Sequence, residues 1–277
     1  MVRYCGAHEF HYPGHKVTDS HTSSDLSLSS RTLSAYMLGT LDFEAFFAFQ
    51  RRLIYDVGGD RTTGAVVLCD HPPCVTIGRE GSRAHIRPNF DALGAGFRLY
   101  GPLNSTLQRC PVRWVSRGGG TMLHLPGQVA CYPMVPLDLL GLTASRYVEE
   151  LQNIAIELLR TFNINGSIDP LRPGIRVNGR RVVHIGAAIR ERISCFGLIV
   201  NVNPKLELFH EVQCDGDPKP MTSLQREAAT CIRVQAVRQR LLELLAMRLG
   251  FDRFSVFHNY PSTPIRSIRY AAAAANS

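Results

Sequence analysis

The chain has 277 residues, of which 45% are hydrophobic and 19% are charged, a composition typical of a globular protein with a substantial core. It contains no apolar run of about 18 residues, so we expect no membrane-spanning helix and no membrane partner. The formal net charge is +8, and only three of the 31 basic residues are lysines. Because no nucleic-acid-binding motif accompanies this charge, we expect acidic proteins rather than nucleic acid as partners.

The two ends of the chain are predicted to lie outside one folded domain. Residues 1–33 are rich in His, Ser and Thr with little hydrophobic periodicity, which predicts a mobile extension before a domain at 34–262 and a disordered tail at 263–277. Cys5 and the histidines near it match no closed metal-site spacing, so no metal is expected. The eight irregularly spaced cysteines, with no CxxC and no secretory signal, indicate reduced thiols and a cytoplasmic protein.

The first predicted elements of the domain are a helix and two strands. Asp42 is placed to cap a helix that extends to about Tyr55, with apolar residues at helical spacing. A strand at 65–69 then leads through Pro72-Pro73 into a second strand, because paired prolines break a helix and favour a turn. A short helix at 89–93 and a loop at 101–111 are expected to follow.

Three consecutive glycines follow the next predicted strand, at 112–117, which carries the only tryptophan, Trp114, expected in the core. Glycines 118–120 let the backbone approach a ligand closely and leave amide groups free to donate, and Arg117 adds a fixed positive charge. A glycine triplet by itself favours a plain tight loop, and the ligand-binding loop is the alternative interpretation. The elements expected next are a strand at 128–135 and a helix from Thr143 to about residue 162.

The central stretch predicts an antiparallel meander. Apolar runs at 174–177, 182–189 and 193–202 are strands, and Asn178-Gly179 favours a two-residue hairpin turn between the first two. A loop with Cys214 comes next, and then a helix at about 225–248. A thiol on a loop beside a rigid sheet is well placed to act as a nucleophile, although it can equally be a small turn residue. The mixture of strands and helices indicates an α+β fold.

Three segments resemble the lipoyl(octanoyl) transferases of the biotin/lipoate ligase superfamily. Residues 117–128 are similar to the RGGxxTYHGPGQ segment of that family, and residues 70–79 to its EHPPVYTLGR segment. Residues 174–224 resemble its G-x-K-I-A-x-I-G, LALNVN, PCG and TSL run. The resemblance implies a biotin/lipoate protein ligase-like fold, with a mixed β-sheet flanked by helices and an acyl chain bound beside the sheet.

The resemblance also implies an activity and its residues. The family moves an octanoyl group from acyl carrier protein to a lysine of a lipoyl domain through a cysteine thioester, without a cofactor. Cys214 would be the nucleophile, and Arg181 stands where the family has an activating lysine. The residues carried over as acyl contacts are Arg117, Gly118, Gly119, Gly120, Thr121, His124, His184, Ile185, Gly186, Gly197, Leu198 and Ile199.

The position of the nucleophile depends on how the loop is counted. Counting back from Thr222 assigns the family's cysteine to Cys214, whereas counting forward from Phe209 assigns it to Asp215. We place a one-residue gap before Cys214, because a deletion in a loop costs little free energy and keeps a thiol in the site.

Other departures from the family pattern bear on activity. Arg181 can stabilise a thiolate but cannot accept a proton, so His124 or His184 would have to act as the base. Strand alternation would direct His184 away from Arg181. Phe196 and Leu125 replace a histidine and a glycine of the family and would narrow the acyl pocket. The alternative function is a non-catalytic paralogue that binds an acyl group or a lipoyl domain. An ATP-dependent ligase is disfavoured because the meander has no lysine in its first two strands.

Overall fold

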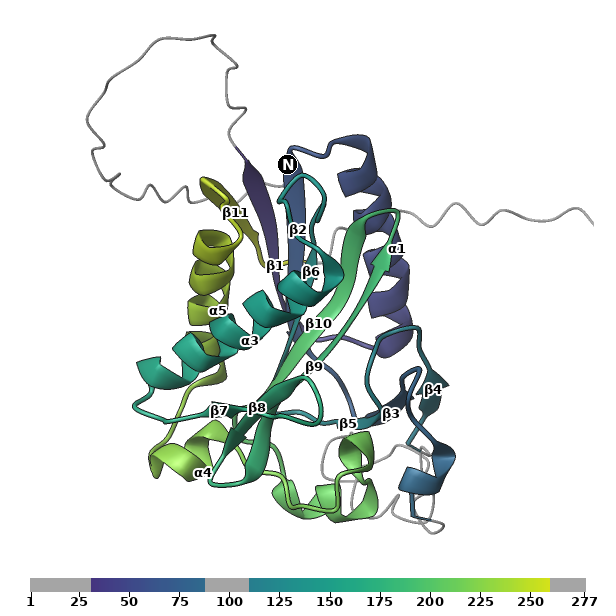
Figure 1. The fold of residues 1–277 in the computed structure, drawn as a ribbon, viewed down its shortest axis with the longest axis vertical. Helices are drawn as coiled ribbons and strands as arrows, with labels where there is room; N and C mark the ends of the chain where they lie inside the picture. Colours follow the sequence, from purple (N-terminus) through teal and green to yellow (C-terminus); the bar gives the residue numbers. More distant parts are fainter. Residues whose placement is uncertain (1–30, 88–109, 260–277) are drawn as a thin grey trace, which may run out of the picture.

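The computed structural model describes residues 31–87 and 110–259, which form a mixed eight-stranded sheet flanked by helices and a small three-stranded sheet (Figure 1). The large sheet has the order β11-β1-β2-β6-β10-β9-β8-β7, and the small one β4-β3-β5. The strands are β1 (Thr32–Thr40), β2 (Thr63–Asp70), β3 (Cys74–Ile77), β4 (Val112–Trp114), β5 (Thr121–His124), β6 (Gln128–Met134), β7 (Ser167–Ile168), β8 (Gly174–Val177), β9 (Arg180–Arg190), β10 (Ile193–Asn201) and β11 (Arg253–Phe257). This is the mixed-sheet α+β fold expected from the sequence.

The large sheet is covered by helices on both faces (Figure 1). The helices are α1 (Phe43–Gly59), α3 (Ala144–Thr161), α4 (Leu224–Ala228) and α5 (Val234–Arg248). Alternation along β2 decides which helix each residue meets: Ala65 and Val67 pack with α1, whereas Val66 packs with α3 and α5. The expected cap of α1 is confirmed, because Asp42 Oδ1 accepts a hydrogen bond from the Glu44 amide at 2.8 Å.

The predicted meander is confirmed as β8, β9 and β10, paired antiparallel. Asn178 and Gly179 form the turn with φ of 50° and 75°, the left-handed values that this hairpin requires. The β8–β9 pairing has one irregularity: Ile175 pairs with Val183, but Arg176 pairs with Arg181. The β9 strand therefore carries an extra residue there, a β-bulge.

Two expectations about elements are wrong. Trp114 is 64% exposed rather than in the core, because β4 is an edge strand that ends at this residue and pairs only with β3. The last helix is not continuous: α4 ends before Ala229, whose φ of 51° is left-handed and interrupts helical hydrogen bonding, and α5 begins at Val234.

The expectations about thiols and membrane-spanning helices can be compared with the described residues, whereas those about the chain ends and one internal segment mostly cannot. The seven cysteines among the described residues are free thiols, and only Cys231 of these is exposed. None of the helices in residues 31–87 and 110–259 is long and apolar enough to cross a membrane. The first 30 residues of the predicted extension, the helix at 89–93, most of the loop at 101–111 and the tail lie outside the described residues. The prediction that the extension runs to residue 33 is wrong at its end, because β1 begins at Thr32 and Leu33 is buried in the core.

Candidate active site

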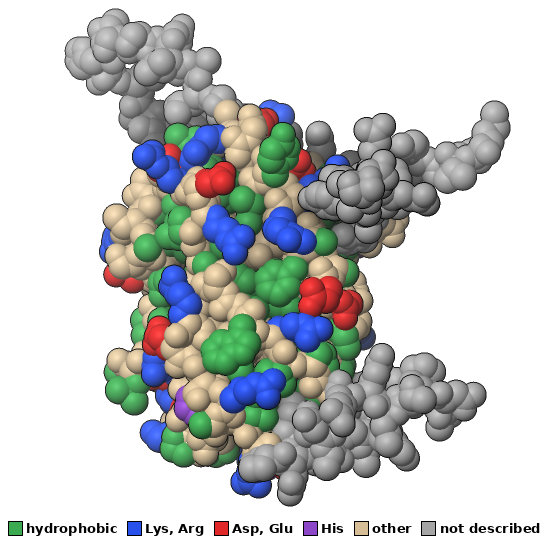
Figure 2. All heavy atoms as spheres, turned by 90° about the vertical axis from the view of Figure 1, so that its right-hand side faces the viewer, with side chains coloured by type: hydrophobic (Ala, Val, Ile, Leu, Met, Phe, Trp, Pro, Cys, Tyr) green, Lys and Arg blue, Asp and Glu red, His purple; other side chains and the backbone are tan. Residues whose placement is uncertain are grey.

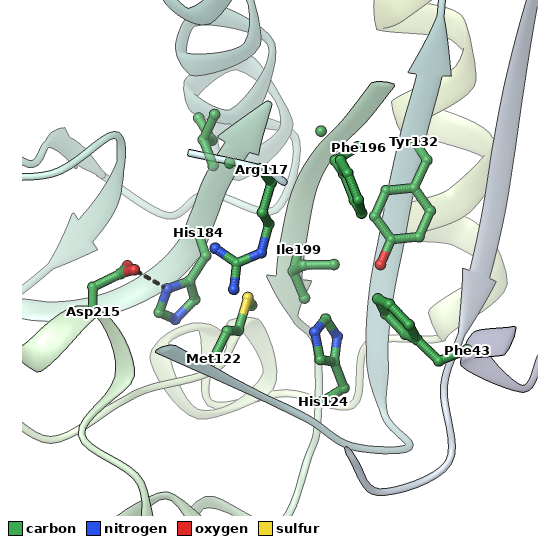
Figure 3. Close-up of a pocket in the computed structure, with 12 residues that line it drawn as sticks. Phe43, Arg117, Met122, His124, Tyr132, His184, Phe196, Ile199 and Asp215 are labelled. Carbon is green, nitrogen blue, oxygen red and sulfur yellow. Dashed lines mark hydrogen bonds and ion pairs between the residues drawn. The ribbon is translucent and has the colours of Figure 1, made fainter. Parts of the chain in front are cut away.

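A cavity lies between β9, β10, β5 and the start of α1, and half of the residues predicted for the site line it (Figure 3). One end is apolar and largely aromatic, and the other end is polar. The apolar end is formed by Phe43, Met122, Tyr132, Phe196 and Ile199, and the polar end by Arg117, His184 and Asp215. The free volume is about 20 Å³, the space of about one water molecule. Side chains therefore have to turn aside before an acyl chain can enter.

The narrowness of the cavity arises in part from Phe196. Its amide donates to Gln50 Oε1 of α1 at 2.9 Å, and its φ of 59° is a left-handed value that non-glycine residues seldom adopt. The ring packs against Phe47 and Tyr132 at the apolar end. The sequence expectation that Phe196 narrows the pocket agrees with this position.

Arg117 and His124 are both held by Thr76 of β3. Arg117 Nη2 donates to Thr76 Oγ1 at 2.9 Å, and His124 Nε2 lies 2.9 Å from the same oxygen. Arg117 Nη1 donates to the Gly118 carbonyl at 3.0 Å. These bonds go to uncharged oxygens, and among the described residues Arg117 has no carboxylate within salt-bridge distance. A buried guanidinium thus presents its charge at the cavity.

The glycine loop does not leave its amides free, which agrees with the plain tight loop favoured from the sequence and not with the alternative of open donors. The Gly118 amide donates to the Ala187 carbonyl at 2.9 Å, the Gly119 amide to Glu80 at 3.4 Å and the Gly120 amide to Asp215 Oδ1 at 2.7 Å. The loop therefore acts as a support that holds Asp215 at the cavity, rather than as a set of open donors.

His184, Arg181 and Asp215 meet at the polar end of the cavity. Arg181 Nη1 donates to Asp215 Oδ2 at 2.5 Å, and His184 Nδ1 lies 3.1 Å from the same oxygen (Figure 3). Simple alternation would place residues 181 and 184 on opposite faces of β9, but the bulge at Val182 changes the phase and brings both to one face. The expectation that His184 points away from Arg181 is therefore wrong.

A wider set of buried ion pairs extends behind these groups. Arg181 also donates to Asp169 at 2.5 Å, Asp169 pairs with Arg176, and Arg176 pairs with Asp217. The side chains of Arg181 and Asp169 are at most 1% exposed. Arg176 and Arg181 are therefore buried in this network and are not available on the surface for a protein partner.

The charges at the site fix the ionisation of its groups. Burial raises the pKa of Asp215, but the hydrogen bond to His184 and the charges of Arg181 and Arg117 outweigh burial and hold this pKa well below its ordinary value. Burial lowers the pKa of His184 from its ordinary value, although Asp215 opposes the change. Asp215 is therefore an anion and His184 a neutral imidazole near pH 7.

Cys214 does not line the cavity. Its side chain is 0% exposed and packs in an apolar cluster with Val75, Ile77 and Leu123. Burial raises the pKa of the thiol to about 12, in spite of the arginines nearby. Asp215, one residue later, occupies the position at the cavity that the resemblance assigns to the nucleophile. The geometry therefore favours the ungapped count of the loop over the gap that we placed before Cys214.

Apart from Gly120, whose amide donates to Asp215, the remaining predicted acyl contacts fall into three groups. His124, Ile185, Gly186, Gly197 and Ile199 line the cavity with Arg117 and His184. Thr121 and Leu198 do not: Thr121 Oγ1 donates to the Ser82 carbonyl at 2.9 Å, and Leu198 packs in the core on the opposite face of the sheet. Gly118 and Gly119 instead border a second cavity of about 350 Å³, which shares Ile185 and Gly186 with the first.

The sequence did not single out several residues that the structure places here. Tyr132 lies in an apolar segment outside the motifs, and Met122 is an apolar residue within the 117–128 segment, so the residue type distinguishes neither from a core residue. Asp169 lies just before the 174–224 segment and outside the family motifs, and folding brings it to Arg181, 12 residues later. Asp215 was signalled by the count forward from Phe209. No group of His, Cys, Asp and Glu suited to a metal ion occurs among the described residues.

Known proteins share this chain's sequence pattern and fold. The sequence model of the family described as the lipoyl protein ligase A/B catalytic domain matches residues 42–246 of this chain. An octanoyltransferase of Geobacter metallireducens is 30% identical over 188 residues, which cover 68% of this chain and 79% of the relative. A mitochondrial octanoyltransferase of Arabidopsis thaliana is 26% identical over 228 residues, which cover 81% of this chain and 92% of the relative. Lipoate-protein ligase A bound with ATP has a TM-score of 0.58 at 12% identity, covering 84% of this chain and 89% of that one, a likeness of fold alone.

Proposed function

The chain belongs to the lipoyl protein ligase A/B catalytic-domain family, and on that premise we propose that it is an octanoyltransferase. The octanoyl donor is acyl carrier protein and the acceptor is a lysine of a lipoyl domain. The observation that carries the proposal is the cavity of Figure 3, which joins an apolar end suited to an acyl chain to a charged end suited to a thioester. Curated octanoyltransferases with comparable sequences support it.

Arg117 is the group best placed to stabilise charge during transfer. When a nucleophile attacks a thioester, the carbonyl oxygen becomes an oxyanion, and a fixed cation in a buried site stabilises that charge most strongly. The guanidinium of Arg117 is bonded only to oxygens of Thr76 and Gly118, so its positive charge is not cancelled by direct contact with a carboxylate. We assign it the oxyanion, with the acyl chain directed toward Phe196.

The surface around the site supports the two protein partners. Arg79 and Arg83 are exposed on the segment that packs against the glycine loop. Figure 2 shows Lys and Arg side chains spread over one face of the molecule, separated by hydrophobic side chains. Such a surface suits acidic protein domains, because opposite charge speeds the encounter while apolar contact contributes most of the affinity.

The test is transfer in solution. The protein is incubated with octanoyl-acyl carrier protein and an apo lipoyl domain, and the intact mass of the lipoyl domain is measured with and without the enzyme. We expect an enzyme-dependent octanoyl adduct on the lipoyl domain that resists hydroxylamine, because an amide, unlike a thioester, is stable to it. A lipoyl domain that stays unmodified with active donor present would contradict the proposal.

A second candidate function is binding without turnover, and the observation that favours it is Asp215 at the place expected for the nucleophile. In that case octanoyl-acyl carrier protein or the lipoyl domain would co-elute with the protein in gel filtration, while the lipoyl domain would gain no mass. The same samples therefore distinguish the two functions.

A further inference from the structure

His184 has one ring nitrogen engaged and the other free. Nδ1 lies 3.1 Å from Asp215 Oδ2, whereas the buried Nε2 has no hydrogen-bond partner within the described part of the chain. The side chain is 3% exposed and lines the cavity. A buried polar nitrogen without a partner is unusual, because leaving it unpaired costs free energy, so it points to a group that arrives with the substrate.

Asp215 fixes which nitrogen carries the proton. Its Oδ2 is bonded to Arg181 and its Oδ1 accepts from the Gly120 amide at 2.7 Å, so the carboxylate is ionised and held in place. An anion accepts the hydrogen of Nδ1–H, which leaves the lone pair on Nε2 directed at the cavity. Figure 3 shows the Asp215–His184 contact at the polar end, with Arg117 beside it.

We propose that His184, oriented by Asp215, is the general base of a single-displacement transfer, in which the acceptor amine attacks the thioester directly and no acyl-cysteine forms. The inference rests on the proposed acyl transfer and deepens it by naming the base and the order of bond changes. It assigns to this pair the proton transfer that Arg181 cannot perform, because a guanidinium stays protonated in proteins.

The proposed transfer forms one carbon–nitrogen bond, breaks one carbon–sulfur bond and moves one proton from nitrogen to sulfur. The neutral ε-amine of the acceptor lysine forms a bond from nitrogen to the thioester carbonyl carbon, and its proton passes to His184 Nε2. The carbon–sulfur bond then breaks with its electron pair on sulfur, and the imidazolium returns the proton to that sulfur. The products are an amide and a free thiol, with no oxidant, reductant or metal required.

Neither Cys214 nor Asp215 is suited to attack the thioester and form an acyl-enzyme. Cys214 is fully buried outside the cavity, and its raised thiol pKa keeps it protonated near pH 7. Asp215 is bonded to Arg181, His184 and Gly120, so its oxygens are occupied as hydrogen-bond acceptors and are poor nucleophiles. A general base needs only a free lone pair and a neutral ring, and His184 has both.

The charged surroundings of His184 set the pH range in which it can act. Burial, together with the charges of Arg181 and Arg117, keeps the pKa of His184 below its ordinary value, and Asp215 opposes them. His124 faces it across the cavity and is itself neutral near pH 7, since burial holds its pKa well below the ordinary value. Because the acceptor amine must also be neutral, its own ionisation lowers the rate as pH falls, and protonation of Nε2 should make that fall steeper in acid.

The experiment measures single-turnover transfer by His184→Gln, Asp215→Asn and Cys214→Ser, with Cys231→Ser at an exposed thiol as the matched control. His184→Gln should lower the rate by about 10²–10⁴-fold, the range for loss of a general base, and remove the part of the acid limb of the pH–rate profile that is due to protonation of Nε2. Asp215 is a positioning residue, so Asp215→Asn should lower the rate. It should also shift the pH at which protonation of His184 lowers the rate, because Asp215 opposes the lowering of the His184 pKa. Cys214→Ser should transfer at a rate of the same order as Cys231→Ser, with no acyl-enzyme in quenched samples.

A second measurement keeps the test decisive if a variant folds poorly. His184→Ala creates space for a free imidazole, which should restore transfer to this variant but not to Asp215→Asn. Transfer by the wild type that is lost in Cys214→Ser, with a hydroxylamine-sensitive acyl-enzyme, would overturn the single displacement and leave the proposed function intact. A wild type that transfers nothing would overturn the proposed function, and the base assignment with it.

Discussion

Asp215 adopts a left-handed backbone conformation, with φ of 55° and ψ of 20°. Aspartate tolerates this region better than most residues, because its short side chain can bond locally. The conformation turns the carboxylate toward Arg181 and His184 while Cys214, the preceding residue, points into the apolar cluster. A single turn thus decides which of two adjacent side chains lines the cavity.

Phe196 is the residue from which we expect control of acyl-chain length. The cavity of about 20 Å³ cannot hold an octanoyl chain while this ring lies across its apolar end. Phe196→Ala should raise the rate with octanoyl donors relative to butanoyl donors, at a loss of about 3–5 kcal/mol in the free energy of unfolding, the usual range for Phe→Ala in a core. The check is the ratio of kcat/KM for the two donors.

The matched control for that prediction is Phe49→Ala. Phe49 is also buried on the α1 side of the sheet, at 2% exposure, but it does not line the cavity. It should lose comparable stability and leave the ratio of the two donors unchanged. An equal change of the ratio in both variants would show that Phe196 acts through general loosening of the fold.

At the scale of elements, the bulge in β9 and the glycine loop together build the polar end. The bulge brings Arg181 and His184 to one face of the strand. The glycine loop contacts Asp215 through the Gly120 amide, which donates to Asp215 Oδ1. A Cβ on Gly120 would lie 2.7 Å from the Asp215 Cα and 3.2 Å from its carbonyl carbon. Because these are backbone atoms, they cannot move aside as a flexible side chain would.

Gly120→Ala should therefore displace Asp215 and lower transfer as strongly as Asp215→Asn. Overpacking of this kind costs about 1–3 kcal/mol of stability. Gly118→Ala provides the comparison for stability, because its Cβ would meet nothing closer than 3.5 Å and the unfolding midpoint should stay at the wild-type value. Transfer rates and urea midpoints measure the two effects, and wild-type transfer by Gly120→Ala would contradict the close approach.

For the whole molecule, buried neutral histidines predict a loss of stability in acid. Burial lowers the pKa of His71 to about 4, and it also lowers those of His124 and His184. The unfolded chain, in which each histidine titrates near pH 6.5, therefore binds more protons between about pH 6.5 and 4. The stabilisation is present above pH 6.5 and is lost as pH falls through this window, on the order of 3 kcal/mol from His71 alone.

Urea unfolding between pH 7 and pH 4.5 measures this dependence. The midpoint should fall steadily, and His71→Gln should flatten the slope, whereas His210→Gln, at an exposed site, should leave it as in the wild type. A midpoint that does not change over this range would show that the three imidazoles are hydrated or protonated in the folded protein.

Much of the fold follows from local signals in the sequence. Asp42 before an apolar periodic run predicts α1, and Asn178-Gly179 between two apolar runs predicts the β8–β9 hairpin, because caps and tight turns depend on a few adjacent residues. Trp114 shows the limit of such reasoning. Its hydrophobicity favours the core, but its burial depends on whether another element covers the edge strand, and none of the described elements does.

At the candidate site, the sequence by itself determined the family resemblance and most of the residues at the cavity, Arg117, His124, His184 and Gly186 among them. Only the tertiary structure decided that Asp215, and not Cys214, reaches the cavity, and that a bulge turns His184 toward it. The physical reason is that motifs fix which residue types occur near one another, whereas the direction of each side chain depends on backbone angles and register. Those are set by contacts between segments far apart in the chain, such as Gly120 with Asp215 and Arg181 with Asp169.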